Sequence, residues 1–343
     1  MAKILILGAG SMSTAFAFPC SDNNHKVSIV GTHLEDNFID IIKSNKNIHP
    51  VLKSKIPHNV KIYKFDSFND LLKDADLIVI GVSSKGINWV SKQLIKIKNN
   101  QQILILTKGL DVNKKNRYEV YSDTVKNILL KNGIKNLKIS VAAGPCLASN
   151  LSKKVLTNVI FANKKISVVK KLSKLLTTSY YKIKCSNDVI GVAACGGIKN
   201  IYAMIVGTSL GINLKNVNDN NNLNTAAALF NQSIIEMCYF IKKIGGKNST
   251  VLDLAGVGDL YVSCTGGRNS KMGKFIGMGM TYKNAKLKKM PNETVEGADL
   301  IFEIGKKIVK DFTFNELPLM TTFIKALLNN TKFNINRKIF YKC

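Results

Sequence analysis

The chain has 343 residues, of which 45% are hydrophobic, and this is enough for two domains of ordinary size with a core in each. Its formal net charge is +28, but only three residues are arginines, and the other 47 of the 50 basic residues are lysines scattered along the chain. We therefore assign the lysines to solvated faces and expect no nucleic-acid partner, although a positive field attracts small phosphorylated substrates. The seven cysteines are odd in number and form no C-x-x-C pair, which argues against disulfides or a zinc site and for a reducing, cytoplasmic location.

Short apolar runs alternate with helical patterns along the first 187 residues. We expect strands at 3–7, 26–30, 60–63, 77–82, 103–106, 140–143 and 159–162, and helices at 11–21, 35–45 and 86–97. Strands that alternate with helices indicate an α/β protein with a parallel, doubly wound sheet. The continuous apolar character of the strands indicates burial on both faces of that sheet.

From about residue 188 onward the sequence has almost no strand pattern. Helical patterns recur at 188–208, 224–243, 267–278, 296–308 and 316–329. We therefore predict a first domain at 1–187 and an all-helical C-terminal domain at 188–343 that carries substrate and catalytic groups. Residues 189–212 are long and apolar enough to span a bilayer, but Lys199 and Asn200 would then lie at the membrane centre. We expect a buried core helix and no membrane insertion.

A glycine-rich turn links the first strand to the first helix. Gly8-x-Gly10-x-x-Ser13 has the strand-turn-helix context that a dinucleotide-binding fingerprint requires, which makes the predicted first domain Rossmann-type. Gly8 permits the tight turn, and Gly10 lets a pyrophosphate approach the backbone at the helix N-terminus. Ser13 stands where glycine is usual, so we expect slightly looser packing between helix and strand.

The end of the second strand bears on the choice of cofactor. Gly31, Thr32 and His33 follow it, where an NAD-selective site usually carries a carboxylate, and none occurs before Glu35 and Asp36. We expect Thr32 and His33 to accept a 2′-phosphate, which favours NADP(H) over NAD(H).

A lysine is the strongest candidate for proton transfer. The four histidines all lie in the first sixty residues, whereas Lys199 ends an almost wholly apolar stretch in the helical half. As an ammonium it could protonate an alkoxide, and burial lowers a lysine pKa toward the working range. We expect Asp259 to hold and tune it. The alternative is a buried Lys–Asp ion pair without chemistry.

Arg268 is unusual in a chain that otherwise uses lysine. It follows two glycines and opens a helical pattern, so that its planar guanidinium, Asn269 and helix-terminal amides would suit a phosphate or a carboxylate. The alternative is a surface arginine.

Seven motifs occur along the chain in a definite order. They are Gly8-Ala9-Gly10-Ser11, Thr107-Lys108-Gly109-Leu110, Gly144-Pro145-x-x-Ala148, Gly197-x-Lys199-Asn200, Gly258-Asp259-Leu260, Arg268-Asn269 and Val295-Glu296-Gly297. Together they resemble the soluble NAD(P)-dependent glycerol-3-phosphate dehydrogenase family, from Lys3 to about Met320. The resemblance implies reversible reduction of dihydroxyacetone phosphate to sn-glycerol 3-phosphate, which feeds glycerophospholipid synthesis.

The resemblance also implies roles for individual residues and no metal. Lys199 is the general acid/base with Asp259 and Asn200 beside it, and Lys108 reaches both substrate and cofactor. Besides Thr32 and His33, the cofactor contacts are Gly8, Gly10, Ser11, Met12, Lys108, Ala148, Arg268, Thr294 and Glu296. The substrate contacts are Lys108, Gly144, Cys146, Lys199, Asp259, Ser263, Gly267, Arg268 and Asn269. The sequence leaves oligomeric state open, with a homodimer as the candidate assembly.

Several positions depart from the pattern of the family. They are Met12, Ser13, Cys146, Asn150 and Ala193 or Ala194. Two other functions stay open: a related two-domain reductase of 2-keto or 3-hydroxy acids, whose substrate carries a carboxylate, and a non-catalytic dinucleotide-binding sensor, which only the departures at Cys146, Asn150 and Ala193 or Ala194 support.

Overall fold

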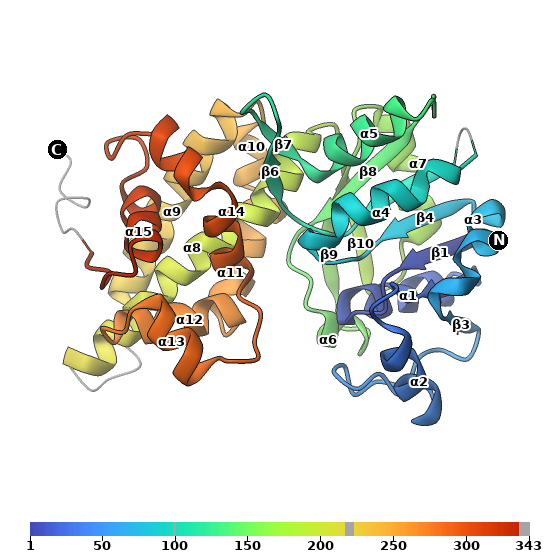
Figure 1. Ribbon diagram of the computed structural model, residues 1–343, viewed down its shortest axis with the longest axis horizontal. Coiled ribbons are helices and arrows are strands. Elements are labelled where there is room, and N and C mark those ends of the chain that lie inside the picture. Colours follow the sequence, from blue (N-terminus) through green and yellow to red (C-terminus); the bar gives the residue numbers. More distant parts are fainter. Residues whose placement is uncertain (99–100, 217–222, 336–343) are drawn as a thin grey trace. The chain divides into compact units, whose positions relative to one another are not determined.

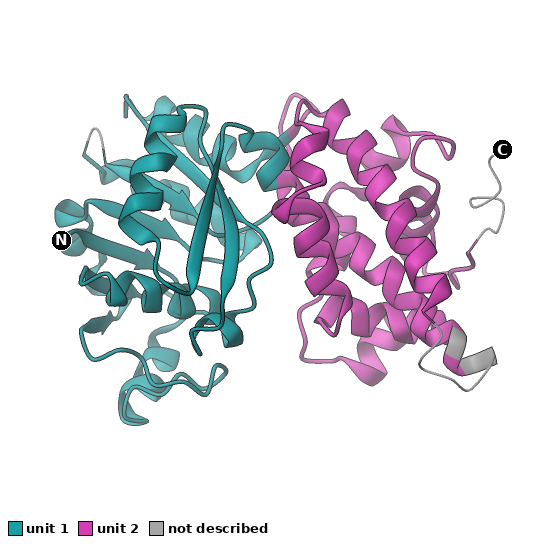
Figure 2. Ribbon diagram, turned by 180° about the vertical axis from the view of Figure 1, so that it is seen from behind, with its two compact units in different colours: residues 1–108, 119–193 teal, residues 109–118, 194–343 magenta. Residues whose placement is uncertain are grey.

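The computed structural model describes residues 1–98, 101–216 and 223–335, which form two compact units (Figures 1 and 2). The first unit comprises Met1–Lys108 and Glu119–Ala193, and the second comprises Gly109–Tyr118 and Ala194–Cys343. The first unit thus continues past the boundary expected at 187/188. A short earlier segment also joins the second unit, because its strand packs on a helix there.

An eight-stranded sheet forms the centre of the first unit, in the order β10-β9-β8-β5-β4-β1-β2-β3 (Figure 1). Its strands are β1 (Lys3–Leu7), β2 (Lys26–Val30), β3 (Val60–Tyr63), β4 (Leu77–Ile80), β5 (Gln102–Ile105), β8 (Lys138–Ala143), β9 (Thr157–Ala162) and β10 (Tyr181–Ser186). Neighbours are parallel except β8 and β9, which are antiparallel. The expected sheet was parallel throughout, and β10 was missed because Lys182 and Lys184 break the continuous apolar run by which the other strands were identified.

Helices connect the strands of this sheet. They are α1 (Ser11–Asp22), α2 (Asp36–Ser44), α3 (Phe68–Asp74), α4 (Ile87–Gln93), α5 (Tyr121–Lys131), α6 (Ala148–Leu151) and α7 (Ile166–Leu176), with 3₁₀ turns at Phe65–Ser67, Ser84–Gly86 and Leu94–Lys96. The chain moves from β1 to β2 in one direction and from β4 to β5 in the other. Right-handed crossovers therefore place α1 and α4 on opposite faces. The strand order reverses at β1 and β4, the usual ligand-binding edge of such sheets.

The second unit is mostly helical. Its helices are α8 (Val189–Asn216, which begins in the first unit), α9 (Asn224–Lys243), α10 (Asn248–Val251), α11 (Asp259–Cys264), α12 (Arg268–Gly277), α13 (Tyr282–Lys289), α14 (Glu296–Asp311) and α15 (Pro318–Leu328), with a π-helical turn at Leu254–Gly258. Strand β6 (Leu110–Val112) adds to them and packs on α14; it pairs with β7 (Tyr118–Val120), of which only Tyr118 belongs to this unit. The unit expected to be all-helical therefore includes a strand from far earlier in the chain.

Helix α8 is the core helix of this unit. By length and composition its segment Val189–Ile212 could cross a membrane, but 94% of its most apolar window is buried inside the protein. Burial of this extent is what the central helix of a folded domain shows, and it agrees with the expected core helix.

Helices α8 and α12 cross at a stripe of glycines. A Cβ atom on Gly207 would lie 2.4 Å from the Ser270 carbonyl oxygen, and one on Gly273 would lie 1.9 Å from the Met204 carbonyl oxygen. Only glycine allows the two backbones to come this close. The crossing brings the N-terminus of α12 alongside the segment of α8 that carries Asn200.

Candidate active site

A buried ion pair joins two helices of the second unit. Lys199 on α8 and Asp259, the first residue of α11, are 7% and 2% exposed, and the Lys199 ammonium donates to the Asp259 carboxylate. It also donates to Ser263 Oγ at 2.8 Å, and that hydroxyl donates to the Asp259 carbonyl oxygen at 2.8 Å. Two partners thus hold the amine in one orientation, as a buried charge requires.

A π-helical turn sets the start of α11. Asp253 caps this turn by accepting from the Leu254 backbone N–H at 2.8 Å. Within it a Cβ on Gly256 would lie only 2.0 Å from the Val251 carbonyl oxygen. Such turns occur often at functional sites, and this one ends at the residue before Asp259. The sequence pattern did not reveal it.

A thiol lies next to this pair. Burial raises the pKa of Cys264 to about 12, against the opposing effect of the Lys199 ammonium. The thiol therefore stays protonated at neutral pH and does not compete with Lys199 in proton transfer.

Four polar side chains form a second group in this unit. Asn269 donates from Nδ2 to Asn200 Oδ1 at 3.0 Å and accepts from the Gly297 backbone N–H at 2.9 Å. Asn200 donates to Glu296 Oε2 at 3.2 Å, and Arg268 Nη2 donates to Glu296 Oε1 at 3.3 Å. The two amides are buried, whereas Arg268 and Glu296 are about half exposed. The group places a guanidinium at a helix N-terminus, which is an arrangement that binds anions.

The remaining expected residues of the second unit lie beside this group. Gly267 is the extended N-cap of α12, and Thr294 is exposed two residues before α14.

The expected residues near β5 and β8 are held together within the first unit. Lys108 Nζ donates to the Gly144 carbonyl oxygen at 3.1 Å, and Gly144 has a φ of +119° that favours glycine. Cys146 and Ala148 are partly buried and pack against the core. Thr107 donates to the Val82 carbonyl oxygen at 2.6 Å, so its hydroxyl serves the packing of β4 and β5.

The glycine turn after β1 has the shape that a pyrophosphate needs. Gly8 has a φ of +97°, and a Cβ on Gly10 would meet nothing within 4 Å. Gly10 is also the N-cap of α1, and it has no side chain to accept from the first N–H groups of this helix, at Ser11 and Met12. These residues fit a dinucleotide.

The packing at Ser13 corrects one expectation. Ser13 is fully buried, and its hydroxyl donates to the Gly81 carbonyl oxygen at 3.0 Å. A Cβ on Gly81 would lie 2.0 Å from Ser13 Oγ, so the glycine after β4 provides the room that the missing third glycine would have given. The packing of helix on strand is tight, not loose.

Two side chains that the sequence did not single out hold Ala9 in this turn. Glu35 accepts from the backbone N–H groups of Ala9 at 3.2 Å and Thr32 at 2.7 Å. His49 Nδ1 accepts from two backbone N–H groups, so Nε2 carries the proton and donates to the Ala9 carbonyl oxygen at 3.1 Å. Burial lowers the pKa of His49, which keeps this ring neutral. Only the fold reveals these contacts.

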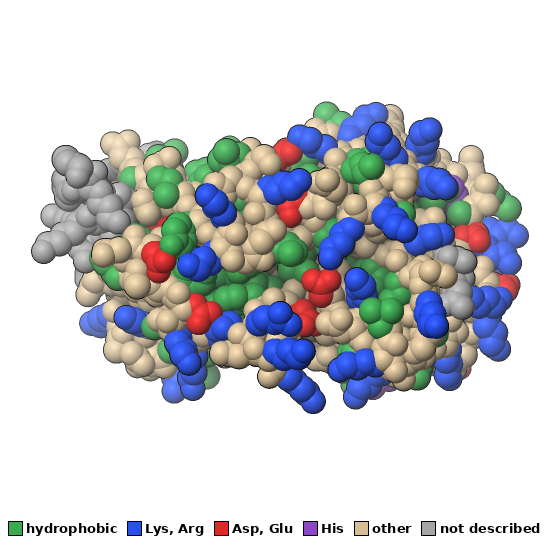
Figure 3. Space-filling view, turned by 90° about the horizontal axis from the view of Figure 1, so that it is seen from above, with side chains coloured by type: hydrophobic (Ala, Val, Ile, Leu, Met, Phe, Trp, Pro, Cys, Tyr) green, Lys and Arg blue, Asp and Glu red, His purple; other side chains and the backbone are tan. Residues whose placement is uncertain are grey.

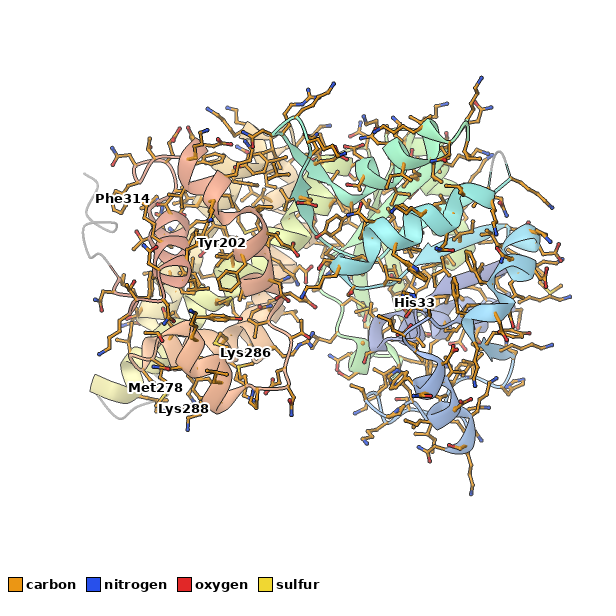
Figure 4. All side chains as sticks on the ribbon, in the orientation of Figure 1. His33, Tyr202, Met278, Lys286, Lys288 and Phe314 are labelled. Carbon is orange, nitrogen blue, oxygen red and sulfur yellow. The ribbon has the colours of Figure 1, made fainter. Side chains whose placement is uncertain are left out.

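Glu35 bears on the choice between NADP(H) and NAD(H), because the sequence favoured NADP(H) on the ground that no carboxylate directly follows β2. A carboxylate does lie between the end of β2 and the glycine turn, although it comes from five residues after the strand. His33 packs its ring against Trp89, with centroids 4.7 Å apart, and contacts Phe65 (His33 is labelled in Figure 4).

Comparisons with known proteins agree with this picture. The family models of the NAD-dependent glycerol-3-phosphate dehydrogenase N-terminus and C-terminus match residues 3–169 and 188–335. A glycerol-3-phosphate dehydrogenase [NAD(P)+] of Clostridium botulinum is 30% identical over 313 residues, which are 90% of this chain and 89% of that protein. The NADP(+)-dependent glycerol-3-phosphate dehydrogenase of Archaeoglobus fulgidus is 28% identical over 90% of this chain and 91% of its own.

Solved structures show the same fold. The glycerol-3-phosphate dehydrogenase of Coxiella burnetii has a TM-score of 0.80 at 26% identity and covers 96% of each chain. A putative 2-dehydropantoate 2-reductase of Enterococcus faecalis reaches only 0.50 at 14% identity, covering 96% of this chain and 97% of its own. The chain therefore belongs to the NAD-dependent glycerol-3-phosphate dehydrogenase family and is an oxidoreductase that uses a nicotinamide dinucleotide.

Proposed function

We propose that the enzyme reduces dihydroxyacetone phosphate reversibly to sn-glycerol 3-phosphate, with Lys199 as the general acid/base. The observation that carries this proposal is the buried Lys199 ammonium, which Asp259 and Ser263 orient. The bound dinucleotide supplies or accepts the hydride. Lys199 Nζ gives a proton to the carbonyl oxygen as that oxygen gains negative charge, and in the reverse direction the neutral amine takes the hydroxyl proton. Asp259 stabilises the ammonium form throughout.

The anion-binding group supports a phosphorylated substrate. Arg268 offers a planar fork of donors at the first turn of α12, and the buried Asn269 next to it is held by Asn200 and Gly297. Binding of a remote phosphate would orient the reacting carbon and so contribute to rate as well as affinity.

Gly8, Gly10, Ser11 and Met12 would hold the dinucleotide pyrophosphate, with Ala9 fixed by Glu35 and His49. NADP(H) stays within the proposal, as the name of the Archaeoglobus relative suggests, but Glu35 adds a negative charge beside the ribose position. NAD(H) therefore fits this turn better than the sequence alone indicated.

The location of the enzyme, the pathway it serves and its partners also belong to the proposal. We propose that the enzyme is cytoplasmic, which the burial of α8 inside the protein supports. We also propose that it feeds glycerophospholipid synthesis and that it assembles as a homodimer. Figure 3 shows Lys and Arg side chains spread over the face in view and not gathered into one patch, which supports a protein without a nucleic-acid partner.

An assay that follows oxidation of NADH or NADPH tests the function. We expect turnover with dihydroxyacetone phosphate and little with dihydroxyacetone or an unphosphorylated 2-keto acid. Lys199→Arg keeps the cation beside Asp259 but cannot give up its proton, so kcat should fall about 10²–10⁴-fold while cofactor binding persists. Arg268→Ala should chiefly raise KM. Arg117→Ala, in the exposed β6–β7 turn, is the control and should change neither kcat nor KM.

Two results would replace the proposal. Preferred turnover of the 2-keto acid would identify a keto-acid reductase. Cofactor binding without turnover of any of these substrates by the natural chain would identify a sensor.

A further inference from the structure

Glu296 contacts two residues of the candidate active site at once. One carboxylate oxygen accepts from Arg268 Nη2 at 3.3 Å, and the other accepts from Asn200 Nδ2 at 3.2 Å. Asn200 directly follows Lys199, and Arg268 is the residue that would bind substrate phosphate. A single carboxylate thus bridges the proton-transfer end and the anion-binding end of the site.

The backbone that carries Glu296 is closely anchored. The next residue, Gly297, donates its N–H to the buried Asn269 at 2.9 Å, and a Cβ there would lie 2.5 Å from the Asn200 carbonyl oxygen. The start of α14 is therefore fixed against α8, and Glu296 presents its carboxylate from a rigid support.

A ligand anion can readily replace the Glu296 carboxylate on Arg268. Both side chains are about half exposed, at 52% for Arg268 and 56% for Glu296. Exposed pairs of this kind contribute little free energy, because water and salt screen them. A phosphate carries up to two charges and three acceptor oxygens, so it binds a guanidinium more strongly than one carboxylate does.

We propose that Glu296 is an internal anion that occupies Arg268 until a phosphate displaces it, and that it thereby lowers the affinity of this group for anions. The inference rests on the proposed function, in which Arg268 binds the substrate phosphate. Every anion that binds Arg268 must first break the same ion pair, so this cost is common to phosphate and carboxylate ligands. Glu296 therefore lowers the affinity for both, and a ligand that binds the guanidinium strongly, such as phosphate, displaces it at the lower concentration. This role adds to the cofactor contact that the resemblance implies for Glu296.

Glu296→Gln tests this role in the full-length protein without cofactor. The glutamine carbonyl can still accept from Asn200, while the ion pair with Arg268 is lost. By titration calorimetry with inorganic phosphate and with acetate, we expect the affinity for each anion to rise by a similar factor, about two- to fivefold. Structural damage would weaken binding and cannot produce this rise.

A matched control exists on the same segment. Glu293 lies three residues earlier and pairs with Lys271 of α12 at 2.5 Å, also near the surface. Glu293→Gln removes the same charge without touching Arg268, so phosphate affinity should change by less than half as much. Equal effects of the two variants, or weaker phosphate binding in Glu296→Gln, would overturn the inference.

Arg268→Ala separates this inference from the proposed function. If it weakens phosphate binding while Glu296→Gln behaves like Glu293→Gln, the function stands and the role of Glu296 fails. If it leaves phosphate binding unchanged, the phosphate-binding role of Arg268 and the inference fail together.

Discussion

Glu236 on α9 is a fully buried carboxylate that the proposed mechanism does not use. It accepts from the backbone N–H groups of Leu319 at 2.8 Å and Met320 at 3.0 Å, in the first turn of α15, and from the Tyr202 hydroxyl at 3.3 Å (Tyr202 is labelled in Figure 4). These contacts join α8, α9 and α15 through one side chain. Burial raises the pKa of Glu236 to about 7, and the hydrogen bonds from the backbone and from Gln232 oppose this rise.

The raised pKa of Glu236 predicts a pH-dependent stability. Between its ordinary pKa of 4.5 and about 7 the folded protein holds a proton that the unfolded chain has released. The free energy of unfolding should therefore fall as the pH rises through this range, by about 3 kcal/mol from this group. Urea unfolding of the natural chain and of Glu236→Gln at a series of pH values measures the difference.

Glu236→Gln should be less stable at pH 5, because the amide nitrogen cannot accept one of the two backbone N–H bonds that the carboxyl oxygens accept, but its free energy of unfolding should fall less as the pH rises. Parallel pH profiles for the two proteins would show that Glu236 does not titrate in this range.

Glu35 makes a second residue-scale prediction. Glu35→Gln removes the negative charge at the end of β2, so affinity for NADPH relative to NADH should rise about fivefold, since the 2′-phosphate no longer meets a carboxylate. Trp89, the single tryptophan, packs on His33 in the same unit, and its fluorescence reports both dissociation constants.

Asp36→Asn is the control, because its exposed carboxylate accepts from the Phe65 backbone N–H at 3.4 Å, outside the glycine turn. An unchanged ratio of the two affinities in Glu35→Gln would remove Glu35 from cofactor selection.

At the scale of elements, the crossing of α8 and α12 determines where the site residues lie. Four glycines permit it: Gly207 and Gly211 on α8, and Gly273 and Gly277 on α12. The same approach carries Asn269 to Asn200, 69 residues away in sequence. A buried hydrogen bond between two amides depends on such fixed helices, because neither side chain can reach far.

Gly273→Ala should separate these helices. Its Cβ would meet the Met204 carbonyl oxygen at 1.9 Å, so we expect a loss of about 2 kcal/mol or more in unfolding free energy, which exceeds the gain of about 1 kcal/mol from helix propensity. Chemical unfolding measures the loss, and KM for the phosphorylated substrate should rise as Arg268 moves.

Gly10→Ala is the contrasting variant. Its φ of −66° suits alanine and its Cβ would contact nothing within 4 Å, so stability should change by less than about 1 kcal/mol while dinucleotide binding weakens. If Gly273→Ala, by contrast, were as stable as the natural chain, that result would contradict the close crossing of α8 and α12.

The same scale shows which elements a sequence pattern can predict. β1, β2, β3 and α9 have the bounds that their patterns indicated, because each is a short, mostly apolar run or a long periodic helix between clear breaks. β10 was missed because Lys182 and Lys184 interrupt its apolar residues twice, and the strands β6 and β7 were missed because each has only three residues.

For the whole molecule, the two units divide the candidate residues between them. The glycine turn, Glu35, Lys108 and Gly144 belong to the first unit, and Lys199 with its partners belongs to the second. Composition had indicated two domains and the motif order had indicated the family. The assignment of Gly109–Tyr118 to the second unit, however, depends on contacts that β6 makes with α14, more than 180 residues later.

The sequence by itself determined the class of fold and the family, and it predicted the main site residues, since apolar periodicity and motif order are local properties of the chain. The contacts of Lys199 with Asp259 were inferred from residue type and burial, and Ser263 from the resemblance. Only the tertiary structure decided that Glu35 and His49 hold Ala9, that Gly81 makes room for Ser13, and that Glu296 bridges Arg268 and Asn200. These contacts join residues 26 to 96 positions apart, and no local pattern specifies which distant side chains will meet when helices and strands pack.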